Sequence, residues 1–131
     1  GGIVVGTGNK VEDFGVGFYT KYGDGGVDIS PIADLYKTEV WDLGKELGID
    51  QRIIDAEPTD GLWEDNRKDA DQLHGMTYPD LEWCMQNCDA PVDGMTEQEI
   101  DNIELYKIVR SRNLHKMNPI PVFTKNLGGV K

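Results

Sequence analysis

The sequence has few cysteines, few basic residues and no long apolar run, and each shortage excludes a class of protein. Its two cysteines, Cys84 and Cys88, lie four positions apart, which is no framework of disulfide bonds and fits a reducing compartment. No stretch approaches the roughly 20 apolar residues that span a bilayer, and there is no charged-then-apolar signal segment. We therefore expect a cytoplasmic protein without a membrane partner.

Basic residues are scarce and unevenly placed. The net charge is −11, from 13 basic and 24 acidic residues. Residues 55–104 contain 15 acids and only two bases, whereas residues 105–131 contain six bases and no acid. Nucleic acid is a poor partner for such a chain, because phosphate backbones need a broad basic surface. The basic tail is still suited to one small anionic ligand.

The length of 131 residues fits one domain, and 38% apolar content is enough to fill its core. Residues 3–5 are β-branched and end at a Gly-Thr-Gly-Asn turn before a helix start, as buried strands of parallel α/β sheets do. Natural domains rarely begin within a sheet. We therefore expect a truncated α/β domain, while Gly1-Gly2 also fits a cloning scar.

Local patterns predict the helices. One begins near Lys10, and after a glycine-rich ordered loop over residues 18–29 another carries a single buried apolar stripe that Gly48 ends. The stripe consists of Tyr36, Val40, Leu43 and Leu47. A short helix through residues 53–54 precedes an acidic loop over residues 59–75. Capping boxes at residues 77–80 and 96–99 then open two helices, the second longer than the first.

The turn after the first strand offers two candidate ligand contacts. Backbone N–H groups are unsatisfied where a strand ends and a helix begins, and ligands of α/β proteins bind at such edges. Thr7 is placed to contact a nucleotide there, and the Glu12 carboxylate is placed to reach a hard cation such as Mg²⁺. From spacing alone, a plain turn and a first-turn acid favoured by the helix dipole explain the same residues.

The glycine-rich loop and the basic residues give a second set of candidates. Three glycines in residues 23–26 let backbone approach a ligand, with Lys21 as a cation and Asp28 as a hydrogen-bond acceptor, although an ordered turn needs no ligand. Lys37 lies in the first turn of its helix, where the dipole disfavours a cation, so it either meets an anion or is solvated. His115-Lys116 either clamp a phosphate or satisfy a helix C-terminus.

Other chemistry is not indicated. His74, Cys84 and Cys88 do not have the spacing of a zinc site. The sequence also lacks a Gly-x-Ser-x-Gly nucleophile elbow and a Walker-type lysine loop.

The motifs themselves resemble those of the NAD synthetase family over nearly the whole chain. The Lys-Tyr-Gly-Asp-Gly-Gly loop at residues 21–26 is the most specific of them. The others are Val5-Gly6-Thr7-Gly8-Asn9-Lys10, Pro31, Leu35-Tyr36-Lys37, Leu47-Gly48, Pro58-Thr59-Asp60-Gly61-Leu62-Trp63, Thr77-Tyr78 and His115-Lys116 before Pro119.

The resemblance implies a fold, a reaction and roles for the candidate residues. The fold is α/β and Rossmann-like, of the adenine nucleotide alpha hydrolase type, with helices flanking a parallel sheet. ATP adenylates the carboxylate of deamido-NAD, and ammonia then displaces AMP. By the same resemblance, Thr7, Lys37 and Thr59 contact ATP, and Glu12 holds Mg²⁺. The residues implied for deamido-NAD are Lys21, Asp28, His115 and Lys116.

The chain also departs from the family. It contains no Ser-Gly-Gly-x-Asp-Ser pyrophosphate loop, which the family carries in its amino-terminal half. Residues 1–131 are therefore expected to be the carboxy-terminal part of a synthetase domain, inactive alone. The full-length enzyme would be a homodimer of the family type, with its nitrogen from ammonia or from glutamine.

Two other functions remain open. A related ATP pyrophosphatase, such as a GMP-forming amidotransferase, would share the fold but not the Lys-Tyr-Gly-Asp-Gly-Gly loop. A non-catalytic acidic binding domain would explain the 15 acids of residues 55–104, although such runs are usually solvated faces.

Overall fold

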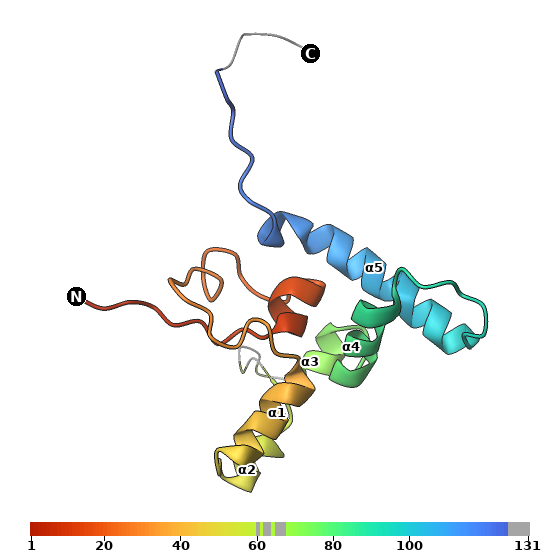
Figure 1. Cartoon of the computed structure of the whole chain (residues 1–131), viewed down its shortest axis with the longest axis horizontal. Coiled ribbons are helices and arrows are strands. Elements are labelled where there is room, and N and C mark those ends of the chain that lie inside the picture. Colours follow the sequence, from red (N-terminus) through yellow and green to blue (C-terminus); the bar gives the residue numbers. More distant parts are fainter. Residues whose placement is uncertain (60, 62–63, 65–67, 126–131) are drawn as a thin grey trace.

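The computed structural model describes residues 1–59, 61, 64 and 68–125. Its regular elements there are helices: η1 (Lys10–Val16), α1 (Lys37–Glu46), α2 (Gln51–Ile54), α3 (Asp69–Gln72), α4 (Tyr78–Asn87) and α5 (Glu97–Met117). Figure 1 shows η1, α4 and α5 gathered together, α1 and α2 projecting as an arm, and the described segments before η1 and after α5 leading away from the body. None of the described helices is long and apolar enough to cross a membrane.

The core lies where η1, α4 and α5 meet. Val11, Val16, Leu81 and Cys84 are fully buried there, and Tyr106 is 3% exposed. Burying such side chains contributes about 1.5–3 kcal/mol each to folding. This core fixes the helix η1 that follows Thr7 and carries Glu12.

Short-range capping explains where the helices begin. The buried Asn9 side chain accepts hydrogen bonds from the N–H groups of Val11 (3.0 Å) and Glu12 (3.1 Å), so η1 begins at Lys10. Thr77 and Thr96 form capping boxes with the acids three residues later, as predicted. The capping boxes confirm the predicted starts of α4 and α5.

The prediction of one buried stripe on α1 is wrong. None of its residues is buried; Leu43 is 41% exposed and Leu47, just after the helix, 69%. The helix itself forms as predicted and Gly48 follows it in the left-handed conformation, with φ of 69°. Thr38 and Trp41, in the first turns of α1, contact α4, whereas Leu43 and Leu47 further along stay exposed.

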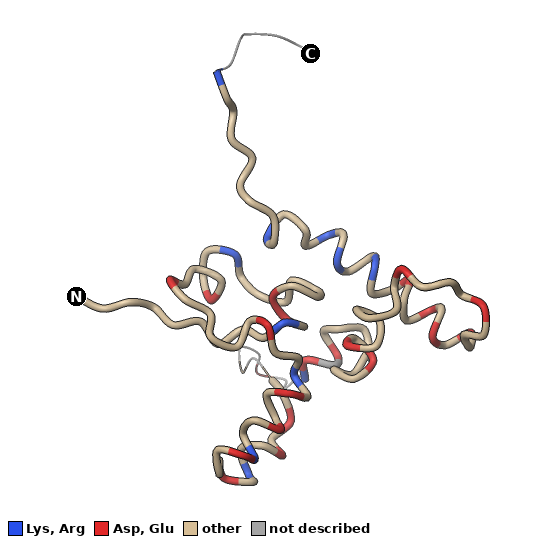
Figure 2. The backbone as a smooth tube through the Cα atoms, in the orientation of Figure 1, with Lys and Arg blue, Asp and Glu red and all other residues tan. Residues whose placement is uncertain are grey.

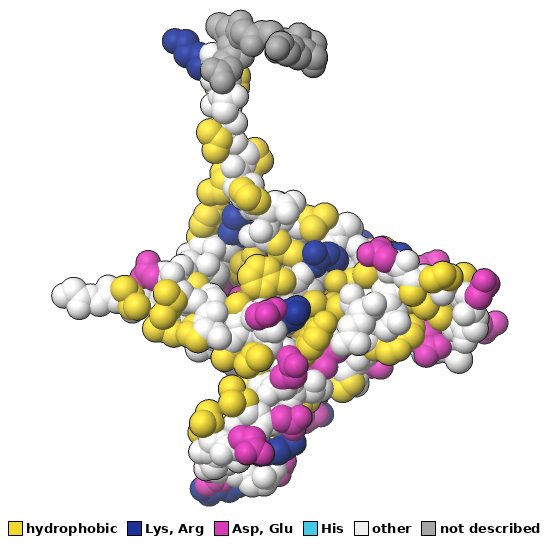
Figure 3. All heavy atoms as spheres, in the orientation of Figure 1, with side chains coloured by type: hydrophobic (Ala, Val, Ile, Leu, Met, Phe, Trp, Pro, Cys, Tyr) yellow, Lys and Arg dark blue, Asp and Glu magenta, His cyan; other side chains and the backbone are white. Residues whose placement is uncertain are grey.

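The predicted buried strand at residues 3–5 is not buried. Ile3, Val4 and Val5 are 65%, 55% and 51% exposed, and Figure 3 shows apolar side chains along this end of the chain. Val5 forms an isolated parallel bridge with Ile29, and no longer strand forms among the described residues. The bridge gives the segment around Val5 one parallel neighbour, but a sheet needs further strands along the other side of this segment. The parallel sheet is therefore absent from the described part of the chain.

The predicted acidic loop over residues 59–75 needs a partial correction. Residues 60, 62–63 and 65–67 lie outside the described residues, and α3 forms within the remainder. Asp71 accepts a hydrogen bond from the Lys68 N–H at 3.0 Å, which favours this one-turn helix.

Candidate functional site

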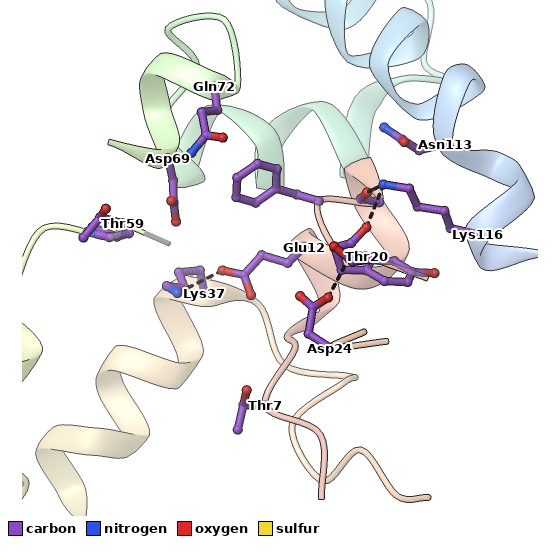
Figure 4. Close-up of a pocket in the computed structure, with 14 residues that line it drawn as sticks. Thr7, Glu12, Thr20, Asp24, Lys37, Thr59, Asp69, Gln72, Asn113 and Lys116 are labelled. Carbon is purple, nitrogen blue, oxygen red and sulfur yellow. Dashed lines mark hydrogen bonds and ion pairs between the residues drawn. The ribbon is translucent and has the colours of Figure 1, made fainter. Parts of the chain in front are cut away.

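A cavity of about 610 Å³ lies between η1, the loop that follows it, α1, α3 and the end of α5. Five residues that the sequence singled out line it together: Thr7, Glu12, Lys37, Thr59 and Lys116. Figure 4 shows Glu12 and Lys37 pointing toward each other, with Thr7 apart from them and Lys116 on the opposite side. Asp24, Asp69, Gln72 and Asn113 also line the cavity, and sequence reasoning did not select them.

An ion pair occupies one wall of this cavity. Lys37 Nζ lies 3.0 Å from Glu12 Oε1, and the two side chains are 20% and 17% exposed. The Tyr78 hydroxyl donates a second hydrogen bond to Glu12 Oε1 at 2.7 Å. Partial burial strengthens both contacts relative to a pair in water.

The surroundings keep Glu12 ionised. Burial alone would raise the pKa of its carboxyl, but the charge of Lys37 and hydrogen bonds from Tyr78, Lys37 and Asn9 outweigh burial, so the pKa is lowered. The Tyr78 hydroxyl has a raised pKa, first because of burial and then because of the Glu12 charge, so it stays a donor. Glu12 therefore lines the cavity as an ionised carboxylate at neutral pH.

Lys37 meets an anion at a helix N-terminus, which is one of the two alternatives that the sequence left open. It is the first residue of α1, where the dipole disfavours a cation, and the Glu12 carboxylate offsets this cost. Its Nζ also lies 4.8 Å from the centre of the Tyr78 ring, a distance at which the ring face attracts a cation.

The next acid along η1 behaves differently. Burial, together with the charges of Glu12 and Asp24, raises the pKa of Asp13 to about 6. The Asp13 carboxylate oxygens lie 2.2 Å from where a Cβ at position 8 would stand, so Gly8 leaves the space that this side chain occupies. Asp13 therefore takes up a proton as pH falls through about 6, where the neighbouring Glu12 is still ionised.

The glycine-rich loop folds as an ordered turn. Asp24 Oδ1 accepts a hydrogen bond from the Thr20 N–H at 2.7 Å, and the Thr20 carbonyl accepts from the N–H groups of Gly23 and Gly25, both at 3.0 Å. These bonds turn the Asp24 side chain toward the cavity. Tyr19, Thr20 and Asp24 of this loop line the cavity.

Three of the predicted deamido-NAD residues do not line the cavity. Lys21 Nζ donates to the His115 carbonyl, and the Asp28 carboxylate accepts from the Val4 N–H at 2.7 Å. His115 Nδ1 lies 3.1 Å from the Arg112 carbonyl. The structure therefore brings Lys21 and His115 together at the end of α5 and uses Asp28 to hold the amino-terminal segment.

Side chains of α5 bond a series of carbonyls at the end of η1. Arg110 donates to Phe14 and Gly15, Asn113 to Val16 at 2.9 Å, and Lys116 to Gly17 and Tyr19, both at 2.7 Å. We call Arg110, Asn113 and Lys116 the α5 clamp. Gly17 has φ of 68°, and a Cβ there would lie 2.6 Å from that of Asn113, so a glycine is required. The clamp fixes the backbone from which the glycine-rich loop starts.

Figure 2 shows Lys and Arg recurring along the later part of α5, whose end lies beside the glycine-rich loop. Asp and Glu lie on α1 and in the segment before α5. The sequence predicted this asymmetry, but not that Lys116 is turned onto backbone oxygens. Burial lowers the pKa of Lys116, opposed in part by the Asp24 charge.

The described residues contain no group of three or more His, Cys, Asp or Glu side chains that could hold a metal ion. Mg²⁺ does not need one, because proteins commonly bind it through one or two carboxylates together with substrate phosphates. Glu12 fits that use: it is a hard, ionised ligand at the wall of a cavity that also contains Lys37.

Comparisons with known proteins show the family of the chain. The family model described as NAD synthase matches residues 1–119. The NH(3)-dependent NAD(+) synthetase of Methanococcoides burtonii is 46% identical over 124 residues, which are 88% of this chain and 45% of that protein. The enzyme of the same name from Methanosarcina mazei is 36% identical over 127 residues, covering 91% of this chain and 48% of that protein.

Two solved structures share the fold. The NMN synthetase of Francisella tularensis superposes with a TM-score of 0.71 and 32% identity, over 95% of this chain and 47% of that chain. The NH3-dependent NAD synthetase of Campylobacter jejuni, in complex with nitrate ion, gives a TM-score of 0.65 at 21% identity, over 94% and 45%. The chain thus spans about half the length of these relatives. On the match over residues 1–119, the chain belongs to the NAD synthase family.

Proposed function

We propose that the protein containing this chain amidates deamido-NAD to NAD, with ATP as co-substrate and ammonia as nitrogen donor. One observation carries the proposal: Thr7, Glu12, Lys37 and Thr59 line a single cavity in a chain of the NAD synthase family. Relatives that are 46% and 36% identical bear the name NH(3)-dependent NAD(+) synthetase.

The candidate residues then have roles in this reaction. Thr7, Lys37 and Thr59 bind ATP, with the Lys37 ammonium facing phosphate oxygens. Glu12 holds Mg²⁺, which offsets phosphate charge when bound. Deamido-NAD lies toward the glycine-rich loop and the end of α5, near Lys21, Asp28, His115 and Lys116. Adenylation of the nicotinate carboxylate releases pyrophosphate, and ammonia displaces AMP from the adenylate.

The division of the enzyme is part of the same proposal. Residues 1–131 form the carboxy-terminal part of a synthetase domain, and the segment that grips the ATP phosphates belongs to the other part. The parallel bridge of Val5 with Ile29 would become the edge of a complete parallel sheet. The full-length enzyme would act as a homodimer.

A second candidate is the formation of nicotinamide mononucleotide. Of the two solved structures compared, the NMN synthetase of Francisella tularensis has the higher TM-score and the higher identity, 0.71 and 32%. The same cavity would then amidate a mononucleotide, and the two candidates differ only in the size of the pyridine nucleotide.

The test is an assay for amide formation with Mg-ATP and ammonium, using deamido-NAD and nicotinate mononucleotide in parallel. This chain would be assayed alone and with a separately produced amino-terminal half from a relative. We expect turnover only in the mixture, with the larger kcat/KM for deamido-NAD. Preference for the mononucleotide would favour the second candidate. Two folded, associated halves that turn over neither substrate would contradict the synthetase assignment.

A further inference from the structure

Tyr78 contacts both members of the ion pair in the cavity wall. The side chain is 6% exposed and stands at the first position of α4. Its hydroxyl lies 2.7 Å from Glu12 Oε1 and 3.1 Å from Asp69 Oδ2. A hydroxyl has one proton to donate, and the shorter contact directs it to Glu12. The oxygen of Glu12 that accepts from Lys37 is therefore also held by Tyr78.

The ring of Tyr78 holds the other member of the pair. Lys37 Nζ lies over the ring at 4.8 Å from its centre. Trp41, one turn further along α1, packs against the same ring edge-on, with centres 6.1 Å apart and planes at 83°. The ring is thus fixed in place while its face attracts the lysine.

Glu82 lies one turn after Tyr78 on α4 and holds the start of α1. It is 8% exposed, and its two carboxylate oxygens accept from the Thr38 N–H at 3.0 Å and from Thr38 Oγ1 at 2.7 Å. The first N–H groups of a helix have no partner within it, so Glu82 supplies one from another helix. Since Lys37 precedes Thr38, this contact fixes the backbone that carries the lysine.

We propose that Tyr78 and Glu82 are positioning residues, which hold Lys37 and Glu12 in the orientation that receives Mg-ATP. This proposal takes its ligand, Mg-ATP, from the proposed function. The contacts that position Lys37 and Glu12 do not depend on that function. Neither residue lines the 610 Å³ cavity, so each acts through Lys37, Glu12 or Thr38 and does not contact the nucleotide. A purely structural role would stabilise the fold without affecting the lysine.

The first experiment needs no ligand. Tyr78→Phe keeps the ring and removes the hydroxyl, Glu82→Gln keeps the shape and removes the charge, and Tyr106→Phe is a matched control at a buried tyrosine outside the site. Each variant of this chain would be acetylated with limiting acetic anhydride, with Lys37 scored by mass spectrometry against exposed Lys45. We expect Lys37 to react severalfold faster in the first two variants and unchanged in the control.

The second experiment measures Mg-ATP affinity by calorimetry in the complex with an amino-terminal half. Loss of a hydrogen bond to a charged group predicts that Kd rises about tenfold in Tyr78→Phe, with Tyr106→Phe unchanged. Unaltered Lys37 reactivity in both folded variants would overturn the positioning proposal. If Tyr78→Phe fails to fold, Glu82→Gln decides alone. Failure of the wild-type complex to bind Mg-ATP would instead count against the proposed function, because the acetylation result still stands.

Discussion

At the scale of single residues, Cys84 in α4 and Cys88 just after that helix are predicted to differ in reactivity although they are one turn apart. Cys84 is fully buried, and burial, with smaller effects from Asp80 and Cys88, raises the pKa of its thiol to about 11. Cys88 is only partly buried. At pH 8 we therefore expect a maleimide to label Cys88 at least tenfold faster than Cys84, measured by peptide mass spectrometry.

The Cys88→Ser variant provides the control, because Cys84 is then the only thiol. Its labelling should remain slow at pH 8 and accelerate as pH rises toward 11, where the thiolate forms. Fast labelling of Cys84 at pH 8 in the folded variant would contradict the burial seen here.

At the scale of elements, the α5 clamp is predicted to stabilise the start of the glycine-rich loop. Lys116→Met leaves the carbonyls of Gly17 and Tyr19 without their donor, while Lys107→Met removes an exposed lysine of the same helix. We expect the free energy of unfolding to fall by about 1–2 kcal/mol for the first and to change little for the second. Urea denaturation followed by circular dichroism measures both. Equal stability of the two variants would show that Lys116 does not act through the backbone.

The elements also show what could be predicted from the sequence. Capping boxes at Thr77 and Thr96 predicted helix starts because the bonds involved span three residues. The burial of the α1 stripe was predicted wrongly because periodicity identifies an apolar face and not what covers it. The resemblance gave roles to Glu12 and Lys37 but none to Tyr78, although Thr77-Tyr78 is one of the matched motifs. The position of Tyr78 beside the ion pair depends on the packing of α4 against η1 and α1, which no local pattern encodes.

At the scale of the whole molecule, large apolar side chains are exposed on several segments, including the one after α5, where Val122 and Phe123 are 77% and 90% exposed. Two of these segments can be compared directly: the amino-terminal segment, with Ile3, Val4 and Val5 between 51% and 65% exposed, and the α1–α2 arm, with Leu47 and Ile53 at 69% and 68%. The amino-terminal segment combines this exposure with backbone that is paired on one side by residues 28–29. Extended, β-branched backbone with a free side is prone to pair with another chain.

We therefore predict that the isolated chain associates through its amino-terminal segment more than through the arm. Replacing Ile3 and Val5 by lysine should lower the average mass in concentrated solution toward that of the monomer, because charges disfavour edge pairing. Replacing Leu47 and Ile53 by lysine adds the same charge elsewhere and should change the mass less. Light scattering after size exclusion measures both. Equal effects of the two replacements would assign association to general hydrophobicity, whereas a monomeric wild-type chain at all concentrations would contradict the prediction.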